Sequence, residues 1–127
     1  MDPIAVFGQS ELGQYHKAYF CNSIYQLVDT FGNPPENSLG LTLAMQALMF
    51  ETKVIFFRVE EEGFSDMDYI KGFEILKNPN EIKKISAICL PNVGDHKIID
   101  RTDLICKIHR CLLITTDKDL FDYFYSY

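Results

Sequence analysis

Polar residues that could carry chemistry stand just after the apolar runs of the sequence, where strands would end. They are Ser10, Glu61, Asp95, His96 and Asp117. Ligands of open parallel sheets bind outside the carboxyl ends of the strands. We therefore expect these residues to line a ligand site, as nucleophile, as general acid or base, or as contacts to the ribose and phosphate of a nucleotide-like molecule.

No motif gives such a site a defined reaction. The loop at 8–13 lacks the Gly-Lys-Ser/Thr that cradles phosphate, and the chain has no Gly-x-Ser-x-Gly elbow. Asp95 and His96 are direct neighbours, which rarely face each other, and Asp95 is well placed to cap a helix. Cys106 and His109 could share a helix face, but zinc needs three or four ligands. The sequence predicts no catalytic set, no metal site and no cofactor.

The net charge of the chain limits the classes of partner that it is expected to bind. The chain of 127 residues carries 12 basic and 18 acidic side chains, a net charge of −6. Such a chain is a poor match for nucleic acid or an anionic membrane, so we expect neither as a partner. The acidic run Glu60–Glu62, with Asp66 and Asp68, lacks the alternate spacing of an EF-hand loop. It is interpreted as a solvated surface loop.

Strand and helix signals alternate along the chain. Strands are predicted at 4–7, 18–21, 53–59, 85–90 and 111–115, and helices at 24–31, 39–51, 66–77, 95–110 and 120–125. The β-branched and aromatic run at 53–59 predicts a central strand covered on both faces. The alternation predicts an α/β class fold, in which residues 1–127 form a single three-layer domain. Its mostly parallel sheet would have about four or five strands, with helices on both faces.

Two segments are more apolar than a small domain needs. The helix at 39–51 is apolar nearly all round, so we expect it to be buried on several sides or to meet another subunit. Aromatic residues crowd the C-terminal segment, and such residues supply contact area at interfaces; alternatively, Phe121 and Phe124 pack on the sheet of their own domain. The predicted interface residues are Leu41, Met45, Tyr123, Phe124, Tyr125 and Tyr127.

The cysteines and the first residues bear on the compartment. Cys21, Cys89, Cys106 and Cys111 each lie in an apolar run, which favours buried free thiols in a reducing compartment. Asp2 stands where a secretory signal would carry a base, and no stretch reaches the roughly 20 apolar residues that cross a bilayer. We therefore expect a cytoplasmic protein.

The order of the predicted strands, helices and turns along the chain is itself a distinctive pattern. It runs from the strand at 4–8 through Gly13, a strand at 18–23, a helix ending in Phe31-Gly32 and a loop with two prolines to a helix and the strand at 54–59. The second half adds a strand ending at Pro91, a helix with Cys106 and Arg110, and a last strand. This order resembles the sheath subunits of contractile phage tails and related injection machines, over about 120 residues.

The resemblance implies a non-enzymatic structural protein that associates with itself or docks on a larger protein assembly, as a component of a virion or injection machine. Sheath subunits are longer and exchange terminal arms, so the resemblance implies a sheath-like core without them. Residues 51–53 read Glu-Thr-Lys where sheaths often carry Gly-Gly. Two alternatives stay open: a small enzyme or binding domain for a nucleotide-like ligand, and an adaptor whose negative charge steers a basic partner.

Overall fold

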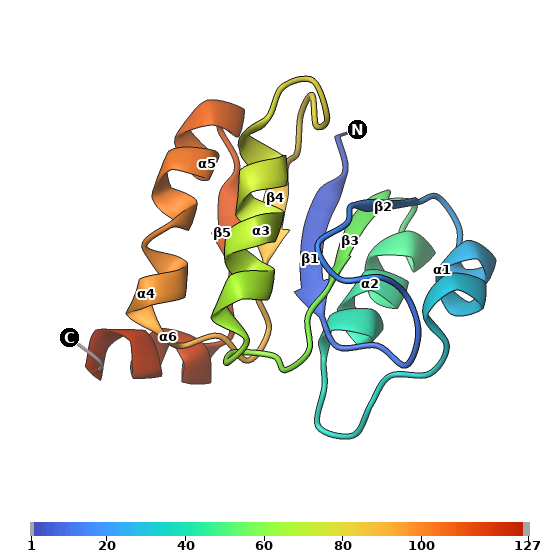
Figure 1. The fold of residues 1–127 in the computed structure, drawn as a ribbon, viewed down its shortest axis with the longest axis horizontal. Coiled ribbons are helices and arrows are strands. Elements are labelled where there is room, and N and C mark those ends of the chain that lie inside the picture. Colours follow the sequence, from blue (N-terminus) through green and yellow to red (C-terminus); the bar gives the residue numbers. More distant parts are fainter. Residues whose placement is uncertain (1, 126–127) are drawn as a thin grey trace.

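The computed structural model describes residues 2–125 (Figure 1). Its elements in chain order are β1 (Ile4–Gly8), β2 (Tyr19–Cys21), α1 (Ile24–Phe31), α2 (Gly40–Met49), β3 (Val54–Arg58), α3 (Asp66–Lys77), β4 (Ala87–Cys89), α4 (His96–Ile99), α5 (Thr102–His109), β5 (Leu112–Ile114) and α6 (Asp117–Tyr125). This confirms the predicted alternation of strands and helices. In the described part of the chain, no helix has the length and apolar character to cross a membrane.

The strands form one five-stranded sheet in the order β2-β3-β1-β4-β5. All neighbouring pairs are parallel except β2 and β3, which are antiparallel. The predicted α/β class with a mostly parallel sheet is therefore confirmed. The run at 53–59 forms β3, an interior strand that is buried on both faces, as its β-branched and aromatic composition predicts.

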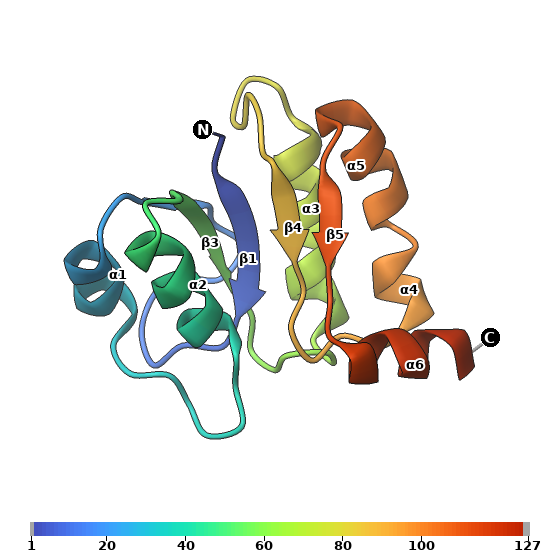
Figure 2. The same cartoon turned by 180° about the vertical axis from the view of Figure 1, so that it is seen from behind.

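Alternation of side chains along the strands divides the core into two layers. Ala5 and Phe7 of β1 pack with α3 and α5, whereas Val6 packs with α1 and α2 on the other face. The rings of Phe7 and Phe57 stack with centroids 4.5 Å apart, which joins β1 to β3 within the first layer. Helices thus cover both faces, but Figure 2 shows that α1 and α2 stand over only one half of the sheet.

The other half of that face lies open over β5. Leu112 and Ile114 pair in register with Ala87 and Cys89, so they point to the same side of the sheet as α2. Their side chains are 73% and 47% exposed, because no described helix stands over them (Figure 2). We call Leu112 and Ile114 the β5 face. On its outer side β5 is also an edge strand.

Local capping signals decide which helix boundaries the sequence predicts correctly. Ser23 caps α1 by accepting a hydrogen bond from the backbone N–H of Gln26 (3.2 Å), and Gly32 ends the helix with a positive φ of 71°. The predicted helix at 95–110 is in fact two helices, α4 and α5. The hydroxyl of Thr102 donates to the carbonyl oxygen of Ile99 (2.7 Å), a local bond that competes with the helical pattern.

Candidate functional site

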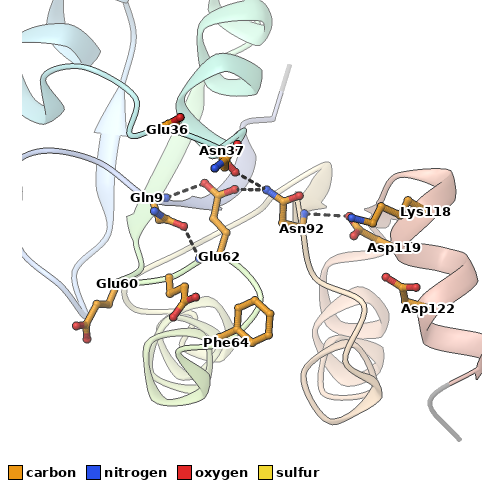
Figure 3. Close-up of a pocket in the computed structure, with 11 residues that line it drawn as sticks. Gln9, Glu36, Asn37, Glu60, Glu62, Phe64, Asn92, Lys118, Asp119 and Asp122 are labelled. Atoms are coloured by element: carbon orange, nitrogen blue, oxygen red, sulfur yellow. Dashed lines mark hydrogen bonds between the residues drawn. The ribbon is translucent and has the colours of Figure 1, made fainter.

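The carboxyl ends of the parallel strands border a cleft of ≈ 640 Å³. Gln9 follows β1, three consecutive glutamates follow β3, Asn92 follows β4, and Asp119 belongs to α6 after β5 (Figure 3). From β1 the chain goes to β3 on one side and later to β4 on the other, so the strand order reverses here. Ligands of open α/β sheets bind at such a point, so this cleft is the candidate ligand site.

Glu62 lies at the centre of this cleft and is only 3% exposed. Its Oε2 accepts hydrogen bonds from the backbone N–H groups of Gln9 (2.9 Å) and Gly40 (3.1 Å). Its Oε1 accepts from the backbone N–H of Leu39 (2.9 Å). The same oxygen accepts from Nδ2 of Asn92 (2.8 Å), a bond drawn in Figure 3. We call this carboxylate and its four donors the Glu62 junction. It joins the ends of β1, β3 and β4 to the start of α2.

The junction also caps α2, which has no capping side chain of its own. Leu39 is the N-cap of α2 and makes no side-chain capping bond. The remote Glu62 carboxylate takes that role, accepting the free N–H groups of the first turn at the positive end of the helix dipole. The approach of α2 to β1 needs two glycines, because a Cβ on Gly8 would lie 2.5 Å from the Cα of Gly40.

The rest of the cleft lining is negatively charged. Glu36, Glu60, Glu61 and Asp122 are exposed, and Lys118 is the one basic side chain among the described lining residues. Asp119 is 4% exposed, and its Oδ2 accepts a hydrogen bond from the backbone N–H of Asn92 (2.9 Å). The two buried carboxylates of the cleft therefore serve the fold, and the exposed ones repel an anionic ligand such as phosphate.

The structure places the predicted ligand residues in different surroundings. Glu61 is exposed and lines the cleft. Asp95 and His96 line a separate hollow, which shares Phe64, Asn92 and Asp122 with the cleft. The carboxylate of Asp95 caps α4, accepting from the backbone N–H of Lys97 (2.9 Å), as expected for an N-cap.

Ser10 and Asp117 border neither the cleft nor this hollow. Ser10 is 6% exposed and its hydroxyl donates to the carbonyl oxygen of Leu12 (2.7 Å), so it holds the loop after β1. Asp117 is exposed at the first turn of α6, where the cap bond comes instead from Thr116, whose hydroxyl accepts from the backbone N–H of Asp119 (3.1 Å).

The cysteine and histidine of α5 do not form a nucleophile pair. His109 is 3% exposed, and its Nε2 donates to the carbonyl oxygen of Leu76 (2.7 Å). Burial raises the pKa of the Cys106 thiol to about 12, and the pKa values of Cys21 and Cys89 to about 11. These thiols stay protonated at neutral pH, so they are poor nucleophiles. All four cysteines are free, as predicted.

Helix α6 carries its apolar side away from the domain. Leu120, Phe121, Phe124 and Tyr125 are 43%, 64%, 66% and 75% exposed. We call these four residues the α6 stripe; the rings of Phe121 and Tyr125 lie 4.7 Å apart within it. The polar Asp119, by contrast, is buried against the domain. This orientation is the reverse of a normal surface helix, which buries its apolar side.

Three contacts fix α6 in this orientation across the carboxyl end of the sheet (Figure 2). The first is the bond between Asp119 and the Asn92 N–H. In the second, the hydroxyl of Tyr123 donates to Oδ1 of Asp100 (2.8 Å). The third is a close approach to Gly94, where a Cβ would lie 2.6 Å from the Cβ of Asp122. The outward direction of the stripe is thus specified by contacts on the opposite side of the helix.

The structure separates the predicted interface residues. Leu41 is 1% exposed and lies in the core below α2, so it has no surface to offer a partner. Met45 is partly buried against the same core layer, and Tyr123 packs against the other one. Phe124 and Tyr125 are exposed, so the alternative that Phe124 packs on its own sheet is wrong. Tyr127 lies outside the described residues.

For α2 the sequence predicts either burial on several sides or contact with another subunit. The first alternative is wrong, because the buried residues of α2 are Gly40, Leu41 and Ala44, which lie along one side. Met49 near its end is 65% exposed, and Phe50 just beyond it is 80% exposed. An apolar composition therefore marks both α2 and α6, and in each helix part of the apolar surface reaches solvent.

The chain has no match among protein-family models, curated proteins or solved structures. The resemblance to tail sheath subunits therefore stays a prediction, and the geometry alone carries the functional argument below.

The roles of two residues are not evident from the sequence. Glu62 was assigned to a solvated acidic loop, and its neighbours Glu60 and Glu61 are indeed exposed. Its different role arises from α2, which brings two N–H groups to it from a distant part of the sequence. Phe121 was assigned to the core alternative, although its spacing from Leu120, Phe124 and Tyr125 places all four on one side of a helix.

Proposed function

We propose that this protein is a non-enzymatic assembly protein that associates with itself through the α6 stripe. The observation that carries the proposal is the outward orientation of α6. Three aromatic side chains of the stripe stand at least 64% exposed, while polar groups of the same helix are bonded to the domain. Aromatic residues are enriched in the contact regions of protein interfaces, and contiguous exposed apolar surface marks interaction sites.

The resemblance of the element order to tail sheath subunits agrees with such a role. The cleft supports the ligand-binding alternative through its place at the switch point of the sheet. Its lining speaks against a nucleotide, because Glu62 and Asp119 are engaged by backbone N–H groups and the exposed acids outnumber the single Lys118. We therefore expect nucleotides to leave the melting temperature unchanged in a thermal-shift measurement.

The test is the mass in solution, measured by light scattering after size exclusion over a wide range of concentration. The wild-type chain should exceed its monomer mass of 14.7 kDa and gain mass as the concentration rises. Replacing Phe121 and Phe124 by Ser should weaken association by roughly tenfold or more. Tyr25 is 84% exposed on α1, far from α6 in Figure 1, so Tyr25→Ser is the matched control and should change nothing.

The dependence on salt distinguishes self-association from binding to a basic partner. Two copies that each carry a charge of −6 repel, so added salt should strengthen their association. A complex with a basic partner would instead weaken as salt screens the attraction. A wild-type chain that stays monomeric at every concentration and every salt level would overturn the proposal.

A further inference from the structure

Two apolar surfaces of this chain lack a covering element among the described residues. One is the α6 stripe, a helical row of Leu120, Phe121, Phe124 and Tyr125. The other is the β5 face, a piece of open sheet formed by Leu112 and Ile114. A helix row and an open sheet face are the two partners of a normal helix-on-sheet layer, so the surfaces are complementary in kind.

Within one copy these two surfaces are held apart. Asp119 and Tyr123 bond α6 to the Asn92 loop and to Asp100, which keeps the helix across the carboxyl end of the sheet. The β5 face points instead toward the side on which α2 lies (Figure 2). The stripe of a copy therefore does not cover the β5 face of the same copy.

We propose that the α6 stripe of one copy packs on the β5 face of a second copy, and that the second copy returns the contact. This inference rests on the proposed self-association and names the surface that receives α6. The occupant of the β5 face is then a second copy of this chain, and the dimer has twofold symmetry with two identical contacts.

The available contact area favours a reciprocal exchange over a single contact. With 150–250 Å² for a whole aromatic side chain, the exposed parts of the stripe supply about 500 Å² and those of the β5 face about 200 Å². One such contact can bury at most about 700 Å² of this surface in total, below the roughly 1,200–2,000 Å² of a stable specific interface. Two reciprocal contacts can bury up to about 1,400 Å², which reaches that range. Stripe against stripe alone would reach only about 1,000 Å².

The experiment mixes two variants that each carry one damaged surface. The stripe variant is Phe121→Ser with Phe124→Ser, and the face variant is Leu112→Ser with Ile114→Ser. Each alone should dimerise at least roughly tenfold more weakly than wild type, because both of its contacts contain one damaged side. In an equal mixture the heterodimer keeps one intact contact, between the wild-type stripe of one chain and the wild-type face of the other. The mixture should therefore associate more tightly than either variant alone.

Control measurements keep this result interpretable. At a concentration where wild type is monomeric, the circular dichroism and the unfolding temperature of each variant should match those of wild type, because all four substituted side chains are exposed. If the face variant unfolds, the single variant Leu112→Ser, at the more exposed position, replaces it. Tyr25→Ser mixed with either variant serves as the matched control; it should give only the association of a wild-type chain with that variant.

The outcomes separate the two proposals. A monomeric wild-type chain overturns both of them. A wild-type dimer whose face variant dimerises normally overturns the exchange and leaves association through the stripe. A dimer weakened by both variants but not restored by mixing also overturns the exchange, because stripe-to-stripe and face-to-face contacts would gain nothing from the mixture.

Discussion

The Glu62 junction and the α6 stripe lie at the same end of the sheet, but one buries a charged side chain and the other exposes apolar side chains. At the junction, a carboxylate from an acidic run is 3% exposed and accepts hydrogen bonds from four donors. In the stripe, side chains typical of a core are 43–75% exposed. Asn92 links the junction to helix α6, since its side chain bonds Glu62 and its backbone N–H bonds Asp119 on the buried side of α6.

This difference shows why residue type alone is a poor guide to function in this molecule. Glu62 is the kind of residue that an enzyme uses, yet all its visible bonding supports the ends of three strands and one helix. Phe121 and Phe124 are residues of the type usually found in a hydrophobic core, yet in this fold they are exposed to solvent. Burying such apolar surface stabilises a protein by roughly 25 cal/mol per Å², and its exposure supports the proposed self-association.

The largest expected effect comes from removing the charge at the junction. In Glu62→Gln, the amide NH₂ group would face N–H donors that now bond an oxygen atom. Leaving these buried groups unsatisfied should lower the free energy of unfolding by about 3 kcal/mol, measured by urea denaturation. The exposed neighbour gives the control, since Glu61→Gln should change it by less than about 0.5 kcal/mol. Equal effects of the two substitutions would show that the junction does not support the fold.

A smaller effect is expected where α6 rests on the domain. In Gly94→Ala the new Cβ would lie 2.6 Å from the Cβ of Asp122 and 3.2 Å from the carbonyl oxygen of Asp119. Both atoms belong to or adjoin the helix backbone and cannot swing away, so α6 must shift, at a cost of about 1–3 kcal/mol. Urea denaturation measures the loss, and hydrogen exchange should show faster exchange in α6.

The control for this substitution is Lys97→Ala, at an exposed position in nearby α4, which should change stability by less than about 0.5 kcal/mol. The shift of α6 should also weaken self-association, because the stripe changes direction. Unchanged protection of the α6 amides in Gly94→Ala would mean that Gly94 does not set the position of this helix.

Much of the fold was predictable because its signals are local. The apolar runs gave the strands, and Ser23 and Gly32 gave both ends of α1, since each acts within one turn of its own position. The start of α2 was not predictable in this way, because its cap is Glu62, more than 20 residues away. The break between α4 and α5 carries no glycine or proline, so nothing in the sequence pattern marked it.

The position of the candidate site could be predicted from the sequence, but the residues that form it could not. Parallel strands bring their carboxyl ends together, so a cleft at the ends of β1, β3 and β4 follows from the alternation of elements. Which of Glu61 and Glu62 is buried depends on where α2 packs against the strand ends, and only the tertiary structure determines that. Likewise, the spacing of the stripe defines one side of α6, but the contacts of Asp119 and Tyr123 decide which side faces solvent.

The smallest expected effect, counted per thiol and per pH unit, concerns the cysteines on the covered part of the sheet. Burial raises the pKa of Cys21 and of Cys89 from 9.0 to about 11. The folded state therefore holds these protons more tightly than the unfolded chain does. The stability that results is complete below pH 9 and is lost as the pH rises toward 11, by at most about 1.4 kcal/mol per pH unit for each thiol. Urea denaturation across this range measures the slope.

A cysteine introduced at position 114 would allow the open part of the sheet to be compared with the covered part. Ile114 pairs in register with Cys89, and both side chains point to the same face, but Ile114 is 47% exposed where Cys89 is 4% exposed. A cysteine at Ile114→Cys should therefore react with a thiol reagent in the folded monomer while Cys89 does not. In the associated state the reaction at position 114 should slow, because a second copy covers the β5 face. Equal reactivity of both thiols in the monomer would erase the distinction between the covered and open halves of the sheet.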